Sequence, residues 1–282
     1  MKVLITGAAG LFGHGLVQVF GAKHEVFALT HADADTAEAA ATRGMFNRLR
    51  PEIVIHTAAI PDLDICEADP AKAFLVNVEG TRNVMEAARE IGAAVAHISS
   101  DAVFDGEKHA PYVETDPVNP QTVYGRTKVE GEGIVGHLPN HWIFRVPVLF
   151  GPGKANFVSK GLDKLRGGEE YVVASDQVAC AAFTLDMARV MMEVIEARSY
   201  GLYHIANAGA CSRLELVLRA AEVAALDAAH IVAKPTDEMK RRAKRLKYSV
   251  MELRALKQAG FSVPRPWENA LEEYVGMWKT EK

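Results

Sequence analysis

The sequence predicts an α/β protein built on a doubly wound parallel sheet, with a smaller lobe formed by its C-terminal part. Short apolar runs alternate with longer amphipathic stretches through the first half, which is the pattern of β-α-β units. A glycine-rich turn follows the first of these runs. After residues 151–153, with the sequence GPG, the alternation of apolar and amphipathic stretches becomes less regular and the segments become shorter. This change favours a second, smaller unit.

The first half supplies the elements of the parallel sheet. Its apolar runs predict strands at residues 2–6, 25–29, 53–57, 94–98 and 142–146. The amphipathic stretches between them predict helices at 11–22, 36–49, 70–91 and 122–137. The helix at 70–91 has recognisable ends, because Asp69 and Pro70 suit its first turn and Gly92 suits its close.

The second half predicts a smaller set of elements. Helices are expected at 155–166, 184–197, 212–225 and 249–258, with short strands near 171–174 and 202–205. We expect one domain at 1–150 that carries the main sheet. A lobe at 151–282, interleaved with that domain, would cover the sheet edge and shape a ligand cleft there.

Bulk composition excludes several classes of protein. The 282 residues are 49% hydrophobic and 24% charged, as in ordinary globular proteins. A formal net charge of -4 argues against a general nucleic-acid binder, which needs a basic face. No apolar stretch is long enough to span a membrane, and three widely separated cysteines suggest neither disulfides nor a zinc site. We expect a cytoplasmic protein without a metal, nucleic-acid or membrane partner.

One basic run, KRRAKR at residues 240–245, departs from this even charge distribution. A solvated helix face is the ordinary interpretation of such a run. The alternative is a lip that meets a substrate phosphate.

The turn from Gly7 to Gly13, with the sequence GAAGLFG, predicts a dinucleotide site of Rossmann type. A strand precedes this turn and a helix follows it, which is the context that makes the glycine pattern specific. Glycine allows the backbone to approach a pyrophosphate closely, and the helix N-terminus offers N–H groups and partial positive charge. The residues expected to contact the cofactor are Gly7, Gly10, Leu11, Phe12 and Gly13.

The end of the second strand bears on which dinucleotide is bound. An acid at this place often holds the adenosine ribose of NAD, but this chain has Leu29, Thr30 and His31. The missing acid leaves room for the 2′-phosphate of NADP, although no arginine is placed to clamp it. Asp33 and Asp35 either line the adenine pocket or are solvated loop acids. NADP is therefore favoured and NAD stays open, with Thr30, His31 and Asp33 near the ribose.

A tyrosine and a lysine, Tyr124 and Lys128, are spaced so that they share one helix face. A ketone that receives hydride also needs a proton, and an ammonium beside a phenol makes it a better acid by lowering its pKa. Ser99 and Ser100 end the preceding apolar strand. We expect Ser100 to donate a hydrogen bond to the carbonyl oxygen, with Tyr124 as proton donor and Lys128 as the charge that tunes it.

These motifs together make the chain resemble an extended short-chain dehydrogenase/reductase, most closely the dTDP-4-dehydrorhamnose reductase branch. The resemblance runs nearly end to end. Besides the glycines, it rests on the segments RPEIVIHTAA at 50–59, NVEGT at 77–81, SSDAVFDG at 99–106, residues 120–128, FR at 144–145 and DQ at 176–177.

The resemblance implies a cofactor lying across the sheet edge and a nucleotide-activated deoxysugar as substrate, bound by the lobe at 151–282. Ala58 and Ala59 would pass beneath the nicotinamide ribose, Ser99 would lie beside the cofactor, and Lys128 would also bind the ribose hydroxyls. A homodimer is consistent with the habit of this family. Asn77 has two interpretations, as part of the functional motif or as a structural helix residue.

Several departures concern the substrate pocket. Ala102 and Pro147 stand where that branch usually has a tyrosine and a tryptophan, and residues 178–182 read VACAA in place of an aromatic, proline-containing loop. A sugar other than dTDP-4-dehydrorhamnose is therefore expected. Two alternatives to a reductase stay open: a sugar-nucleotide epimerase or dehydratase, for which Asp101 could be an acid, and a non-catalytic NADP-binding regulatory subunit.

Overall fold

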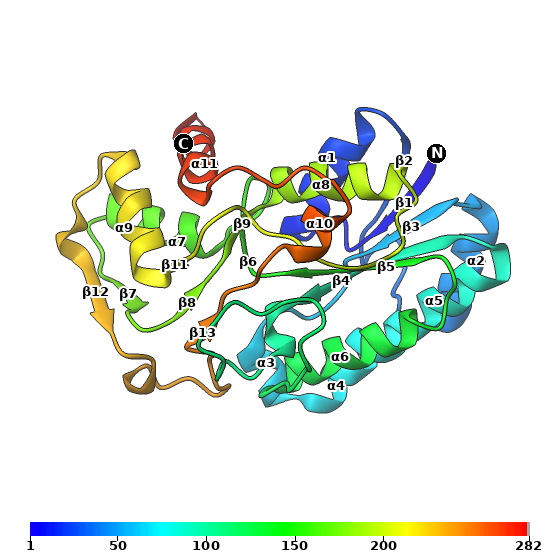
Figure 1. The fold of residues 1–282 in the computed structure, drawn as a ribbon, viewed down its shortest axis with the longest axis horizontal. Coiled ribbons are helices and arrows are strands. Elements are labelled where there is room, and N and C mark those ends of the chain that lie inside the picture. Colours follow the sequence, from blue (N-terminus) through cyan, green and yellow to red (C-terminus); the bar gives the residue numbers. More distant parts are fainter. Residues whose placement is uncertain (281–282) are drawn as a thin grey trace.

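A six-stranded, fully parallel sheet lies at the centre of the computed structural model, which describes residues 1–280 (Figure 1). Its strands follow the order β10-β5-β4-β3-β1-β2. Their bounds are β1 Lys2–Thr6, β2 Glu25–Leu29, β3 Ile53–His56, β4 Ala94–Ser100, β5 His141–Val146 and β10 Gly201–His204. The predicted α/β class and Rossmann-type sheet are confirmed.

Helices cover both faces of this sheet (Figure 1). On one face, α1 (Leu11–Gly21) packs with α8 (Thr184–Glu196); the other face carries α2 (Ala39–Leu49), α5 (Gly80–Ile91) and α6 (Val123–Val135). Alternate side chains of β1 enter different cores, because successive residues of a strand point to opposite faces. Ile5 packs with Leu16 of α1, whereas Leu4 packs with Val84 of α5. Burial on both faces explains why the strands read as continuous apolar runs.

The strand order reverses between β1 and β3, which are neighbours in the sheet. From β1 the chain first adds β2 on one side, and it then adds β3, β4, β5 and β10 on the other. In open α/β sheets, ligands bind beyond the carboxyl ends of the strands at such a switch point. The loops that follow β1 and β3 therefore frame the expected cofactor site.

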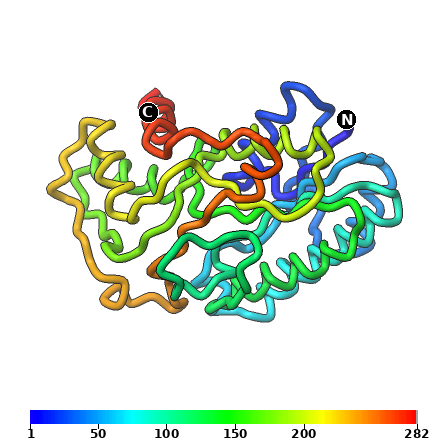
Figure 2. Tube along the Cα trace, viewed as in Figure 1, coloured from blue at the N-terminus to red at the C-terminus, as the bar shows by residue number. Residues whose placement is uncertain are grey.

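The second half of the chain contributes to both parts of the molecule. In Figure 2 the yellow and orange stretches of the chain form much of the part at the left of the view, while β5 (His141–Val146) and β10 (Gly201–His204) belong to the main sheet. The lobe contains β7 (Tyr171–Ala174) paired with β12 (Ile231–Lys234), and β8 (Val178–Ala179) between β11 (Cys211–Ser212) and β13 (Tyr248–Ser249). Its other elements are β6 (Val148–Phe150), β9 (Ala181–Phe183), α7 (Phe157–Arg166), α9 (Arg213–Ala224) and α11 (Trp267–Thr280). Phe150, Phe183, Leu216 and Leu271 belong to its core.

The predicted helix at 70–91 is confirmed, with one irregular turn. It consists of α4 (Pro70–Phe74), a π-helical turn at Leu75–Glu79 and α5, and the Asp69 carboxylate caps it by accepting from the N–H of Lys72. Gly92 ends it with a φ of 74°, a backbone conformation that glycine adopts readily. A short helix, α3 (Leu63–Ala68), precedes it.

The predicted helix at 249–258 is wrong over its first half. Only α10 (Arg254–Gln258) is helical. The chain just before it is extended because β13 pairs with β8, and because the carbonyl of Val250 accepts a hydrogen bond from the N–H of Tyr112. Sequence reasoning also missed α11 altogether.

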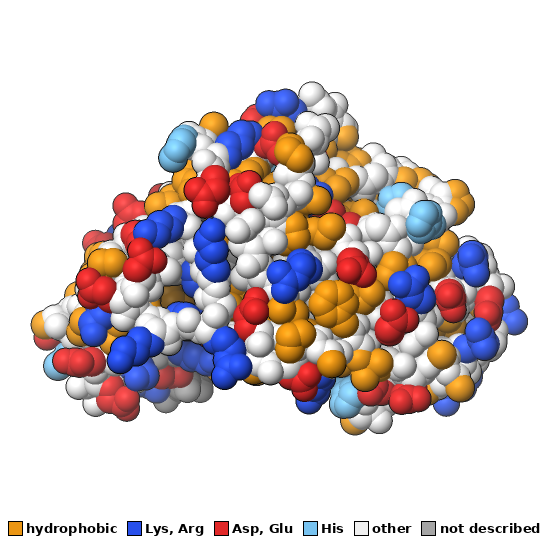
Figure 3. All heavy atoms as spheres, turned by 90° about the horizontal axis from the view of Figure 1, so that it is seen from below, with side chains coloured by type: hydrophobic (Ala, Val, Ile, Leu, Met, Phe, Trp, Pro, Cys, Tyr) orange, Lys and Arg blue, Asp and Glu red, His pale blue; other side chains and the backbone are white. Residues whose placement is uncertain are grey.

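The basic run at 240–245 is not a helix face, so that interpretation is wrong as well. The run lies in irregular chain between a short turn at Thr236–Glu238 and β13, and it lines a cavity of about 450 Å³. Arg245 forms an ion pair with Asp64 of α3, with a closest distance of 2.8 Å. Acidic and basic side chains are mixed across the face in Figure 3.

Within residues 1–280, no helix has the length and apolar character needed to cross a membrane.

Candidate active site

A pocket of about 910 Å³ opens at the switch point of the sheet. Its lining includes the glycine turn after β1, the loop after β3, the end of β4 and the start of α6. The structure brings nearly all of the predicted site residues to this one pocket: Gly7, Gly10, Leu11, Phe12, Gly13, Thr30, His31, Ala58, Ala59, Ser99, Ser100, Tyr124 and Lys128.

Asp33 is the predicted residue that does not line the pocket. Its carboxylate accepts hydrogen bonds from the N–H and the hydroxyl of Thr30, at 2.9 and 2.7 Å, and so fixes the turn after β2. These bonds hold the pKa of Asp33 below its ordinary value. Asp35 lines the pocket instead. Asp33 is therefore not a lining residue of this pocket, whereas a cofactor contact of either acid stays a prediction.

The glycine turn forms a cradle that side chains would fill. A Cβ on Gly13 would lie 2.3 Å from the carbonyl oxygen of Gly7, and a Cβ on Gly7 would lie 2.7 Å from the N–H nitrogen of Ala58. Helix α1 begins after Gly10 without a side-chain cap, which leaves first-turn N–H groups for an anion. The donors and the shape of the turn therefore fit the pyrophosphate of a dinucleotide.

Gly10→Val is expected to weaken binding of both nicotinamide cofactors without unfolding the chain. Gly10 lines the pocket and has a φ of -76°, which a side chain can adopt, although its Cβ would lie 3.0 Å from the carbonyl oxygen of Gly7 and the turn would have to shift slightly. The valine side chain would then occupy pyrophosphate space. Fluorescence titration with NADPH and NADH measures the effect. Gly13→Ala is the contrasting variant, because its Cβ meets backbone and should lower stability instead. Unchanged cofactor affinity in folded Gly10→Val would contradict this placement of the pyrophosphate.

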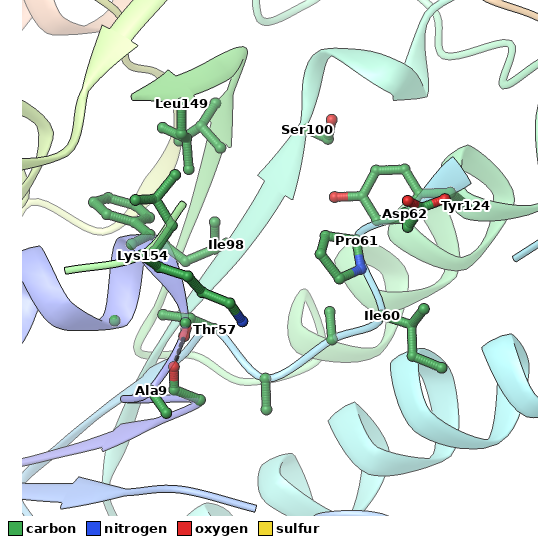
Figure 4. A pocket seen from close by; sticks show the side chains of 18 of the residues that line it. Ala9, Thr57, Ile60, Pro61, Asp62, Ile98, Ser100, Tyr124, Leu149 and Lys154 are labelled. Carbon is green, nitrogen blue, oxygen red and sulfur yellow. Dashed lines mark hydrogen bonds between the residues drawn. The ribbon is translucent and has the colours of Figure 1, made fainter. Parts of the chain in front are cut away.

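The three polar side chains expected to act on the carbonyl, those of Ser100, Tyr124 and Lys128, all line this pocket. Thr122 caps α6 by accepting from the N–H of Gly125, which places Tyr124 and Lys128 on one face of the first turns. Ser100 lies at the end of β4, where its hydroxyl accepts from the N–H of Ala102 at 3.1 Å and donates to Asp101 at 3.0 Å. In Figure 4, the Ser100 hydroxyl and the Tyr124 phenol face the same space.

The electrostatics of Tyr124 differ from the sequence prediction. Burial raises the pKa of Tyr124 above its ordinary value near 10, and this outweighs a hydrogen bond with Ser100 that lowers it. The expectation that a neighbouring lysine lowers this pKa is therefore wrong for the arrangement seen here. The phenol is protonated at neutral pH with or without this shift, and the raised pKa by itself makes it a weaker acid, so the shift does not contribute to proton donation.

Lys128 is a buried ammonium held in a braced helix. Burial lowers the pKa of Lys128 to about 8, although the carboxylate of Glu132 acts in the opposite direction. Glu132 accepts two hydrogen bonds from Arg145 of β5, at 2.9 and 2.7 Å, and one from the hydroxyl of Ser99. Ser99 thus lines the pocket while its side chain ties α6 to the sheet.

Asn77 braces the pocket, which decides between its two interpretations. The side-chain carbonyl accepts from the N–H of Ile60 at 2.7 Å, and its amide donates to the carbonyl of Ile60 and to Thr127 of α6, both at 3.1 Å. The π-helical turn places Asn77 at this junction. It therefore holds the loop after β3 against the helix that carries Tyr124, a supporting role for the site.

Sequence reasoning missed the pocket residues that come from the second half of the chain. Lys154 extends its ammonium into the pocket above Thr57 and Ala9 (Figure 4). Phe157 and Arg213 line the pocket from α7 and α9. No motif marked these residues, because only the fold of the lobe brings them to the sheet edge. Across residues 1–280, no group of three or more His, Cys, Asp or Glu side chains could hold a metal ion.

The fold and the site define an NAD(P)-dependent oxidoreductase of the short-chain dehydrogenase/reductase type. A family model described as "RmlD substrate binding domain" matches residues 1–279. The chain belongs to this RmlD family.

Individual relatives agree over nearly the full length. Spore coat polysaccharide biosynthesis protein SpsK of Bacillus subtilis is 36% identical, over 97% of this chain and 96% of the relative. A solved dTDP-4-dehydrorhamnose reductase from Clostridium acetobutylicum has a TM-score of 0.94 at 36% identity, covering 99% of this chain and 100% of its own. The Bacillus anthracis enzyme of the same name, solved with NADP, has a TM-score of 0.93 at 30% identity, covering 97% and 98%.

Proposed function

We propose that this reductase uses NADPH to reduce a keto group on a nucleotide-activated deoxysugar. The observation that carries the proposal is the convergence of Ser100, Tyr124 and Lys128 in the same pocket as the glycine cradle. Relatives named dTDP-4-dehydrorhamnose reductase, which match this chain over nine-tenths or more of their own length, support the substrate class. The Bacillus anthracis structure with NADP supports the cofactor.

The chemistry that a bound nicotinamide supplies is a hydride for the carbonyl carbon. The chain's own residues handle the oxygen, on which negative charge develops as the bond order falls. Ser100 orients the carbonyl through a hydrogen bond, and Tyr124 delivers the proton from its phenol. The ammonium of Lys128 stabilises the tyrosinate that this transfer leaves, because opposite charges attract strongly in a buried site. Lys128 also offers donors to the nicotinamide ribose.

Thr30→Asp is expected to lower affinity for NADPH more than for NADH. Thr30 lies in the pocket at the end of β2, where a new carboxylate would repel a 2′-phosphate and accept from ribose hydroxyls. Titration of the variant with each cofactor tests this preference, and Thr30→Ser, which keeps a hydroxyl toward Asp33, is the matched control. An equal loss for both cofactors would place the ribose elsewhere.

The reductase proposal is tested by incubating the protein with NADPH and a panel of 4-keto nucleotide sugars while the absorbance of the reduced nicotinamide is followed. Net oxidation with one substrate supports it. An epimerase or dehydratase returns the cofactor to its starting state, so it would change the sugar without net oxidation. A regulatory subunit would bind NADPH tightly and turn over nothing across the panel.

Three further expectations remain part of this proposal. Residues 1–150 hold the cofactor, and residues 151–282 form the substrate-binding lobe that is interleaved with them. The protein works in the cytoplasm. A homodimer is its expected assembly, which light scattering of the purified protein tests directly.

A further inference from the structure

Arg213 presents a guanidinium to the pocket from the lobe side. It is the first residue of α9, whose start is fixed by a capping box between Ser212 and Glu215. The guanidinium carbon lies 5.5 Å from the centroid of the Phe157 ring, and this stacking orients the group. Both side chains line the pocket that contains Ser100 and Tyr124.

Arg213 is a partly buried residue whose guanidinium has no hydrogen bond or ion pair to the protein within residues 1–280. Its Nη1 atom is buried without a hydrogen-bond acceptor, and no ion pair joins the side chain to any residue within 1–280. Arg145, by comparison, is buried and paired with Glu132. A donor atom that is buried without an acceptor is unfavourable, and the partial burial of this cation lowers the pKa of Arg213. Such a donor indicates a ligand that supplies the missing oxygen atoms.

The acidic residue whose charge acts on Arg213 is Asp101, which also lines the pocket. Its charge favours the charged form of Arg213, but its oxygens accept from Ser249 at 2.7 Å and from Ser100 at 3.0 Å. Burial raises the pKa of Asp101 as well, which further weakens it as a counterion. The donors of Arg213 are thus left for an anion that enters with the substrate.

We propose that Arg213 binds the diphosphate of the nucleotide sugar and thereby sets the position of the sugar against Tyr124. This inference rests on the proposed function, which supplies the substrate class. In a nucleotide sugar the diphosphate is joined to C1, across the pyranose ring from a keto group at C4. Arg213 lines the same pocket as Ser100 and Tyr124, which act on that keto group, so one substrate can contact all three side chains. The planar fork of a guanidinium matches phosphate oxygens. A carboxylate on the sugar is the other source of such oxygens, and the experiment separates the two.

The test measures binding of dTDP to the protein saturated with NADP⁺, by calorimetry. Arg213→Met should lower dTDP affinity by about ten- to a hundredfold, since charge-assisted hydrogen bonds are lost, and Arg213→Lys should restore part of it. NADP⁺ affinity should not change. The Met variant should melt no lower than wild type, because an unpaired buried charge has been removed. Arg242→Met, which alters the basic run outside this pocket, is the control and should bind dTDP normally.

Unchanged dTDP affinity in Arg213→Met would overturn the inference. So would a variant that keeps dTDP affinity but loses discrimination between UDP-glucuronate and UDP-glucose, because Arg213 would then recognise a sugar carboxylate. A melting temperature well below wild type, with cofactor and dTDP affinity lost together, would assign Arg213 a structural role instead. Arg213-dependent dTDP binding without turnover of any 4-keto sugar supports the anion site and contradicts only the reductase proposal.

Discussion

Tyr124→Phe is expected to lower turnover by about 10²- to 10⁴-fold, the range typical for loss of a general acid. The phenol is the proton donor, whereas the ring packs in the same way in both proteins. Cofactor affinity should therefore survive. The role rests on the position of the phenol in the pocket beside Ser100, and the phenol is protonated at neutral pH.

The comparison requires turnover and NADPH affinity to be measured separately on each variant. Tyr203→Phe is the matched control, because Tyr203 is also buried but its hydroxyl bonds to Ser199, away from the pocket. It should keep full turnover. Near-native turnover in Tyr124→Phe would remove tyrosine from the mechanism and make Asp101 or a bound water the next candidate for the proton.

Lys128→Met is expected to lose both turnover and cofactor affinity while becoming more stable at pH 7. Burial lowers the pKa of Lys128 to about 8 from an ordinary value of 10.5, so the folded protein holds this proton less tightly than the unfolded chain. The free energy of unfolding therefore rises with pH between those two pKa values. Below about pH 8, the buried ammonium lowers the free energy of unfolding by its full amount. The cost is on the order of 3 kcal/mol.

Urea unfolding at pH 7 and near pH 10 tests the sign of this effect. Methionine has a similar length without the charge, and Glu132 keeps its partner Arg145 in the variant. The stability advantage of Lys128→Met should be largest at pH 7 and shrink as the pH rises. A variant that is less stable than wild type at pH 7 would show that the ammonium stabilises the fold, contrary to this account.

The sequence predicted best those structural features that a single local residue pattern specifies. The glycine turn, the five apolar strands and the Tyr124–Lys128 spacing each depend on a few neighbouring residues, and the fold joins them at one switch point. The missed helix α11 also carried a local signal, because Trp267, Leu271, Tyr274 and Trp278 recur on one face and are buried.

Other features depend on partners distant in the sequence. Residues 248–251 are extended rather than helical because they pair with chain more than sixty residues away, at Val178 and Tyr112. Arg213 and Lys154 reach the pocket only through the packing of the lobe. The pKa of Tyr124 follows from burial, which no spacing reveals, and burial reverses the shift expected from a neighbouring lysine.

In the proposed reaction, hydride passes from a nicotinamide to a sugar carbonyl beside Tyr124. The most direct measurement uses NADPH carrying deuterium at its transferable ring position, with the 4-keto nucleotide sugar that the panel identifies, and mass spectrometry of the product. One deuterium is expected on the former carbonyl carbon with the wild-type protein, and almost none with Tyr124→Phe over the same time. A reduced sugar without the label, or equal labelling by both proteins, would contradict it.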